Sequence, residues 1–131
     1  MPPARHVLIV DDHAELRTMV ARLVAQQYPA ATIAEAENGV AALSSVAQQP
    51  PDLIVTDYQM PVMSGLELVR MLRVQGATMP ILVLSSDTSL VEAIRASGAT
   101  AFLPKPFRIN ALRELLHMLL PADEETQAVG G

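Results

Sequence analysis

Polar side chains that could do chemistry directly follow the short apolar runs of this sequence. They are Asp11 and Asp12 after residues 6–10, Asp57 after 53–56, Ser85 and Ser86 after 81–84, and Lys105 shortly after 101–103. Lys105 is the only lysine, and the other basic residues are arginines. Carboxylates bind cations and can act as nucleophiles in phosphoryl transfer, and hydroxyls and an ammonium can hold phosphate oxygens.

Three carboxylates brought to one place repel one another. Two unit charges about 5 Å apart repel by roughly 3 kcal/mol at an effective dielectric constant near 20. Such a cluster takes up protons or binds a cation, and oxygen ligands alone suit Mg²⁺ first and Mn²⁺ or Ca²⁺ next. An Asp carboxylate is then a candidate nucleophile for a phosphoryl group, with the lysine holding a further phosphate oxygen. We assign the histidines to surface or core packing; they are His6, His13 and His117.

The apolar runs alternate with helical patterns, five of each. Strands that alternate with helices predict an α/β fold with a parallel sheet covered by helices on both faces. Strands at 6–10, 53–56 and 81–84 are apolar throughout and belong in the sheet interior, whereas 32–36 and 101–103 suit its edges. Capping-box spacings predict two helix starts, at Ser64 with Glu67 and at Ser89 with Glu92.

Ligands of an open parallel sheet bind at the carboxyl ends of its strands. The residues after the strands therefore gather at one edge, and Lys105 is expected to point across that edge toward the carboxylates. Taken singly, each has an ordinary explanation: Asp11 and Asp12 could cap a helix, Asp57 could belong to a turn, and Lys105 could be solvated. These explanations fail jointly, because all of the residues share one sheet edge.

The chain resembles the receiver (phosphoacceptor) domain of two-component response regulators. The resemblance is carried by "LIVDD" at 8–12, "LIVTDYQMPVMSG" at 53–65, "ILVLSS" at 81–86 and "FLPKPF" at 102–107. It implies a flavodoxin-like receiver fold over residues 5–121, a doubly wound five-stranded parallel sheet in the order 2-1-3-4-5 with five helices. We expect residues 122–131 to form a disordered tail or the start of a linker.

The resemblance also implies roles for individual residues. Asp57 corresponds to the phosphoacceptor, and Lys105 corresponds to the lysine that pairs with it. The Mg²⁺ ligands correspond to Asp11, Asp12, Asp57 and the backbone carbonyl of Gln59. Ser85 corresponds to the switch hydroxyl and Phe102 to the switch aromatic. Ser85 and Ser86 could both reach the site, and Ser85 is favoured because it directly ends the apolar run. The Lys105–Pro106 bond resembles one that is cis in the family and would aim the ammonium; alternatively, the prolines only end the strand and start a helix.

The resemblance implies a switch rather than an enzyme with turnover. A histidine kinase or phosphotransfer protein is expected to phosphorylate Asp57, and the face formed by the fourth helix, fifth strand and fifth helix then changes to bind a partner or a second copy. A phosphatase of the haloacid dehalogenase type is disfavoured, because its acid/base Asp would stand where Gln59 does. A pseudo-receiver scaffold is disfavoured because the set of site residues is complete.

Composition narrows the possible functions further. The chain has 131 residues, enough for one domain, and a net charge of −5 that argues against binding nucleic acid or an anionic membrane. The lack of cysteine excludes disulfides and thiolate metal sites and fits a reducing cytosol. The apolar run near the start is too short for a signal peptide, so a cytoplasmic location is expected.

Overall fold

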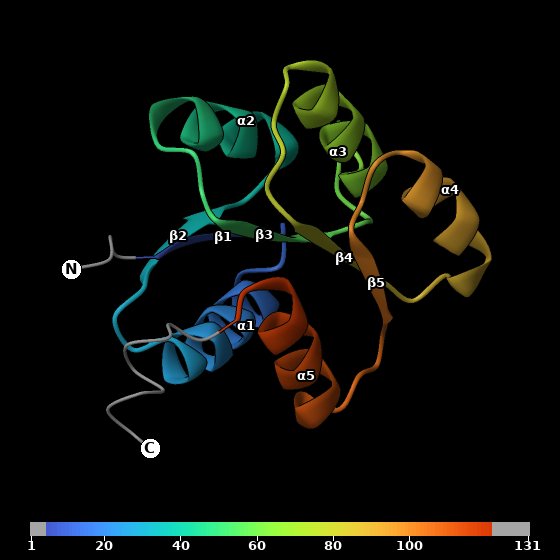
Figure 1. The fold of residues 1–131 in the computed structure, drawn as a ribbon. Coiled ribbons are helices and arrows are strands. Elements are labelled where there is room, and N and C mark those ends of the chain that lie inside the picture. Colours follow the sequence, from blue (N-terminus) through green and yellow to red (C-terminus); the bar gives the residue numbers. More distant parts are fainter. Residues whose placement is uncertain (1–4, 122–131) are drawn as a thin grey trace.

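The computed structural model describes residues 5–121, in which a parallel sheet lies between two layers of helices (Figure 1). The strands are β1 His6–Val10, β2 Thr32–Ala36, β3 Leu53–Asp57, β4 Ile81–Ser85 and β5 Ala101–Pro104. They are parallel throughout, in the order β2-β1-β3-β4-β5, which confirms the predicted doubly wound sheet. The predicted tail at 122–131 lies outside the described residues.

Five α-helices connect the strands. They are α1 Ala14–Gln27, α2 Gly39–Gln48, α3 Gly65–Val74, α4 Val91–Ala96 and α5 Ile109–Leu119, with a 3₁₀ turn, η1, at Thr88–Leu90. Helices α1 and α5 cover one face of the sheet, and α2, α3 and α4 cover the other (Figure 1). Within the described chain, no helix is both long enough and apolar enough to cross a bilayer.

Side-chain alternation along each strand builds two separate hydrophobic cores. In β1, Val7 and Ile9 pack in the core beneath α1 and α5, whereas Leu8 and Val10 pack in the core beneath α2, α3 and α4. Strands β1, β3 and β4 are buried along their whole length, and β2 and β5 are partly exposed edges, as predicted. The rigid interior therefore lies directly behind the ends of the central strands.

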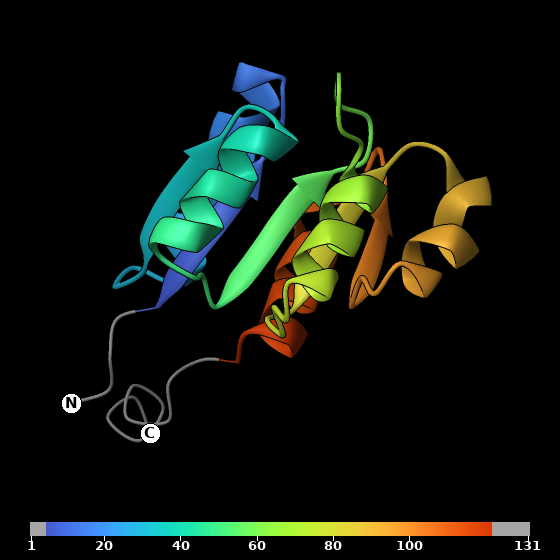
Figure 2. The same ribbon diagram turned by 90° about the horizontal axis from the view of Figure 1, so that it is seen from above.

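Two of the central strands end on the polar residues that the sequence places just beyond them. Asp57 is the last residue of β3 and Ser85 the last residue of β4, and both belong to the buried interior. The parallel register sets Asp57 beside Leu84, and Ser85 beside Pro104. The carboxyl ends of the strands consequently meet at one edge, from which the loop after β3 projects (Figure 2).

Side chains cap two helix starts: the one expected at Ser64, and one at Asn38, for which no cap was predicted. Asn38 Oδ1 accepts the Ala41 amide at 2.7 Å, and Ser64 Oγ accepts the Glu67 amide at 3.2 Å. The predicted start at Ser89 is wrong, because the Asp87 carboxylate accepts the Ser89 amide at 3.0 Å and begins η1 instead. Aspartate is as good a cap as serine, and it comes two residues earlier in the chain.

Gly65, the first residue of α3, permits a close approach that a larger residue would prevent. A Cβ there would lie 2.5 Å from the backbone oxygen of Asp57 and 3.0 Å from Tyr58 Cα, so backbone would have to move. We expect Gly65→Ala to lower the free energy of unfolding by about 1–3 kcal/mol, measured by urea denaturation.

Gly39→Ala is the matched control, because Gly39 is likewise the first residue of its helix. Its added Cβ would meet only side-chain atoms of Met63, the Sδ at 2.5 Å, the Cγ at 2.9 Å and the Cβ at 3.0 Å, and the two closest of these can rotate away. The control should therefore lose less stability. Equal losses in the two variants would contradict a special constraint at Gly65.

Candidate functional site

Asp57 is a buried carboxylate in contact with an ammonium. The residue is 2% exposed, and its Oδ1 forms an ion pair with Lys105 Nζ. Within residues 5–121, this buried Oδ1 accepts no hydrogen bond of good geometry. Burial raises the pKa of Asp57, contact with the Lys105 ammonium opposes that rise, and the charges of Asp11 and Asp12 add to it.

Lys105 reaches Asp57 from the end of the edge strand β5. Its backbone amide donates to the Ser85 carbonyl at 2.9 Å, which extends the pairing of β5 with β4 by one residue. The Lys105–Pro106 peptide bond is cis, as the resemblance implied. The lysine side chain is 24% exposed, so the charge pair lies at the rim of the site rather than sealed inside the core.

Asp11 and Asp12 follow β1 and face the same edge. Asp11 is 3% exposed, and its Oδ1 accepts the His13 amide at 2.9 Å. The Asp11 carbonyl accepts a hydrogen bond from Arg17 at 2.6 Å. Neither aspartate is the N-cap of α1, since that position is His13, whose side chain makes no capping hydrogen bond. Asp11 instead contacts the amide of the N-cap residue.

His13 lies beside these carboxylates, a neighbour that was not predicted from the sequence. Ligand atoms of Asp11, Asp12 and His13 all lie within 4.8 Å of one another, and Asp57 stands outside this group. His13 Nδ1 is 3.6 Å from Asp11 Oδ1 and 3.5 Å from Asp12 Oδ1. A histidine directly after an Asp–Asp pair at a helix start was the available signal, and the expectation of oxygen donors alone left it out.

The remaining predicted residues occupy the rim and one side of the site. Ser85 is 1% exposed and its Oγ accepts the Asp87 amide at 3.0 Å, whereas Ser86 is exposed. Gln59 is exposed in the loop after β3, and among the described residues no donor bonds to its carbonyl. Phe102 in β5 is partly buried against the core beneath α2, α3 and α4.

The donor set of this edge fits a divalent cation. Three carboxylates face one ammonium, the buried Asp57 Oδ1 accepts no hydrogen bond of good geometry, and the Gln59 carbonyl is free of described donors. Oxygen donors of this kind suit hard ions such as Mg²⁺, which binds through one or two carboxylates and keeps several waters. A cation here would offset the mutual repulsion of Asp11, Asp12 and Asp57.

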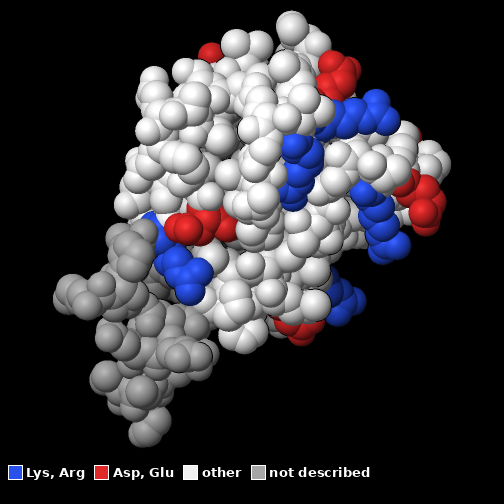
Figure 3. Space-filling view, turned by 45° about the horizontal axis from the view of Figure 1, so that its top comes forward, with Lys and Arg blue, Asp and Glu red and all other residues white. Residues whose placement is uncertain are grey.

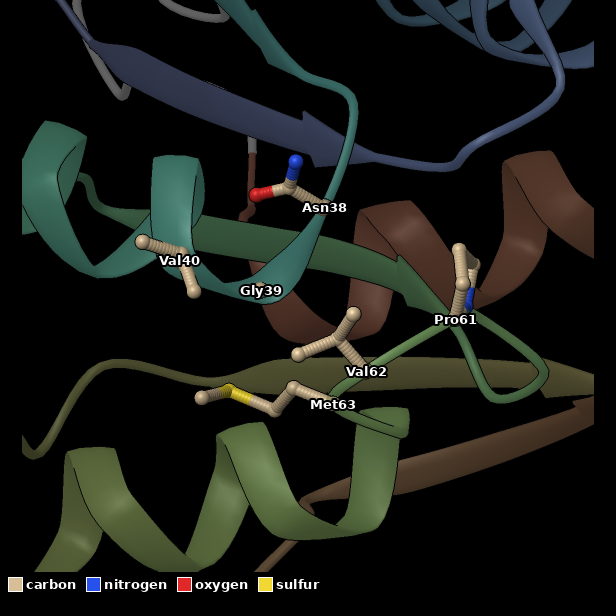
Figure 4. A pocket seen from close by; sticks show the side chains of 6 residues that line it. All are labelled: Asn38, Gly39, Val40, Pro61, Val62 and Met63. Atoms are coloured by element: carbon tan, nitrogen blue, oxygen red, sulfur yellow. The ribbon is translucent and has the colours of Figure 1, made fainter.

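A shallow apolar pocket of about 100 Å³ lies between the start of α2 and the loop after β3 (Figure 4). Its lining residues are Asn38, Gly39, Val40, Pro61, Val62 and Met63. Val62 has a φ of 71° and is 93% exposed, an uncommon conformation for a β-branched residue. No residue from 38 to 51 is charged, and the surface over α2 is largely uncharged (Figure 3). The pocket is lined by no ionisable side chain, so we assign the candidate functional site to the edge with Asp11, Asp12 and Asp57 and not to this pocket.

Comparison with known proteins agrees with this arrangement. The family model "Response regulator receiver domain" matches residues 7–117. Response regulator MprA of Mycobacterium ulcerans is 37% identical over 116 residues, which cover 87% of this chain and 49% of that protein. A protein-glutamate methylesterase/protein-glutamine glutaminase of Nocardioides sp. is 36% identical over 115 residues, which cover 84% of this chain and 31% of that protein.

Solved structures show the same fold. Chemotaxis protein CheY4 of Vibrio cholerae superimposes with a TM-score of 0.82 at 33% identity, covering 90% of this chain and 100% of that one. The chain therefore belongs to the response regulator receiver domain family and is a receiver domain of two-component signalling. It spans between about a third and a half of the length of these two curated relatives.

The raised pKa of Asp57 predicts a pH-dependent stability. Because the folded state disfavours ionisation of this carboxyl, stability in metal-free buffer falls as the pH rises above its ordinary pKa of 3.8. Asp57→Asn removes that cost. We expect the variant to unfold with a free energy on the order of 1 kcal/mol higher at pH 7, because relief of the burial cost of the charge, together with the smaller repulsion from Asp11 and Asp12, outweighs the lost Lys105 pair.

Urea denaturation at pH 7 and at pH 4 in the presence of a chelator measures this difference. The two proteins should converge at pH 4, where Asp57 gains its proton. Glu114→Gln, an exposed carboxylate on α5, is the control and should change stability little at either pH. A variant at Asp57 that is less stable than wild type at pH 7 would show that the Lys105 pair dominates.

Proposed function

We propose that this receiver domain accepts a phosphoryl group on Asp57 in a Mg²⁺-dependent reaction, and that the donor is a phosphohistidine of a sensor kinase or phosphotransfer protein. The observation that carries the proposal is the Asp57–Lys105 ion pair. It joins a nearly buried carboxylate at the end of a central strand to the chain's only lysine. Two further carboxylates, Asp11 and Asp12, stand at the same edge.

The proposed reaction uses the Asp57 carboxylate as nucleophile. A carboxylate oxygen attacks phosphorus, an O–P bond forms, the P–N bond breaks, and its electron pair stays on the imidazole of the donor. Lys105 Nζ, already in contact with Asp57, is placed to hold an oxygen of the transferred group. Asp11, Asp12, Asp57 and the Gln59 carbonyl would hold Mg²⁺, which neutralises charge on the phosphoryl group.

The change at Asp57 has a short path to the neighbouring strand. Ser85 is buried at the end of β4, and its Oγ accepts the Asp87 amide, so its hydroxyl proton is available to a phosphoryl oxygen. The Lys105 amide donates a hydrogen bond to the Ser85 carbonyl, so a backbone contact between β4 and the end of β5 links the two residues. Movement there would shift the loop leading to α4 and allow Phe102 to turn inward.

Energetics require several contacts to share this switch. Changing a population from mostly inactive to mostly active takes about 5 kcal/mol of differential binding, and one charge-assisted hydrogen bond supplies roughly 1.5–3 kcal/mol. Ser85 and Lys105 together, with loop packing, can meet that requirement. The face of α4, β5 and α5 is the surface we propose for a downstream partner or a second copy.

The same residues disfavour the alternatives. A phosphatase of the haloacid dehalogenase type needs an acid/base carboxylate at position 59, and the amide of Gln59 cannot transfer a proton in that way. We therefore propose a phosphoacceptor switch with self-catalysed phosphotransfer and slow autodephosphorylation, acting in the cytoplasm without binding nucleic acid itself. The net charge of −5 supports the last point.

Intact mass spectrometry after incubation with acetyl phosphate and Mg²⁺ tests the acceptor. We expect one phosphoryl adduct in wild type, none in Asp57→Asn, and none when Mg²⁺ is chelated. Glu114→Gln should behave as wild type. The proposal is contradicted if the folded wild-type protein gains no adduct and its amide NMR spectrum also stays unchanged on addition of beryllofluoride with Mg²⁺. That result would favour a scaffold that only binds partners.

Ser85→Ala separates phosphorylation from the switch. The variant should gain the Asp57 adduct to an extent similar to wild type, because Ser85 does not attack phosphorus. Its structural response to beryllofluoride, followed by amide NMR shifts in α4 and β5, should be reduced. Ser86→Ala, at the exposed neighbour, is the control. A full response in Ser85→Ala would rule out this hydroxyl as the switch.

A further inference from the structure

His13 brings a nitrogen donor to the carboxylates of the proposed metal site. Its Nδ1 faces both aspartates, at 3.6 Å from Asp11 Oδ1 and 3.5 Å from Asp12 Oδ1. These separations exceed those of hydrogen bonds, so the imidazole is near the oxygens without being bonded to them. The side chain is 69% exposed, which leaves the ring free to take up a ligand from solvent.

The two nitrogen–oxygen separations at His13 are close to an edge of a zinc coordination shell. Ligand bonds of about 2.0–2.1 Å in a tetrahedral site place neighbouring donor atoms about 3.4 Å apart. The two nitrogen–oxygen distances at His13 are within a few tenths of an ångström of that value. A zinc-sized ion therefore fits His13 and either aspartate nearly as they stand. The preference for zinc comes from the nitrogen donor and not from these separations.

The nearby buried carboxylate of Asp57 adds to the negative charge at this edge. Asp57 Oδ1 is buried, and its partner within the described residues is the Lys105 ammonium. The charges of Asp11 and Asp12 raise the pKa of Asp57, so the three acids interact across the edge. With three carboxylates and one ammonium, the edge retains an excess of negative charge that a divalent ion would balance.

We propose that His13 is a metal ligand in this protein, and that it makes the site favour borderline ions such as Zn²⁺ and Co²⁺ beyond what oxygen donors alone would do. The inference rests on the proposed metal site and concerns which ion that site accepts. Imidazole suits zinc and cobalt, whereas carboxylate, carbonyl and water suit Mg²⁺. His13 with Asp12 would provide a mixed nitrogen–oxygen pair, and Asp11 is close enough to complete or support it.

The composition makes the effect of His13 easy to isolate. The chain has three histidines and no cysteine, so few side chains compete for a borderline ion. His6 is buried at the start of β1, the end of the strand away from the site, and His117 is exposed in the last turn of α5. A response confined to His13 is therefore assignable, and His117→Ala is a matched control.

Calorimetric titration of the untagged chain with Zn²⁺, Co²⁺ or Mg²⁺ tests the proposal, with imidazole ¹H–¹⁵N NMR spectra as a second measurement. His13→Ala should weaken Zn²⁺ and Co²⁺ binding by about tenfold or more, as loss of a ligand does, and change Mg²⁺ binding by less than about twofold. In wild type, Zn²⁺ should shift the His13 imidazole signals and leave those of His6 and His117 in place. Thermal unfolding checks that each variant is folded, and His13→Ser, which retains a good N-cap residue, repeats the test if the alanine variant is not.

The other outcomes separate this inference from the function on which it rests. If His13→Ala binds all three ions as wild type does, His13 is only a neighbour of the carboxylates, and the Mg²⁺ site stands without it. If the wild type binds neither Mg²⁺ nor Zn²⁺, both proposals fail. If Zn²⁺ shifts His117 rather than His13, the ion binds elsewhere and the inference is wrong. Asp12→Asn should weaken every ion if they share one site.

Discussion

A carboxylate buried at the end of a central strand governs the surroundings of this site. Burial opposes the charge of Asp57, and two further aspartates oppose it again, so the ionised form depends on compensation from neighbours. Lys105 supplies one positive charge by direct contact. The rest must come from a cation or a proton. The proposed phosphorylation, the proposed metal binding and the expected pH dependence of stability would thus all follow from a single charge imbalance.

The sheet holds the charged groups together through backbone contacts rather than through long side-chain networks. The Lys105 amide bonds to the Ser85 carbonyl, and the amide of Gly65 bonds to the Tyr58 carbonyl directly after Asp57. The carbonyl of Asp11 is held by Arg17. Strand ends are rigid because hydrophobic cores lie on both sides, whereas the loop carrying Val62 stands outside them. The residues at the strand ends are therefore held in place, whereas the loop that carries Val62 is held by fewer contacts.

Strand positions and their order were predictable because alternation of apolar runs and helical patterns is a local property of the sequence. Gathering of Asp57, Ser85 and Lys105 followed from parallel topology alone. The start of α4 could not be predicted from the sequence, since Asp87 and Ser89 are both acceptable caps and local spacing cannot rank them. The orientation of His13 also escaped prediction, because it depends on how the chain turns after β1. Sequence thus identified the elements, while loop geometry decided which side chains meet.

Having a single lysine carries a consequence for covalent modification. Apart from the chain's own α-amino group, Lys105 is the only primary amine available to acylating reagents. Its side chain is 24% exposed, so reagents can reach it. Acetylation would remove the charge that faces Asp57 while leaving every arginine intact. Side-chain amine reactivity within this chain therefore reports on one position, and a label placed there would remove the contact with Asp57.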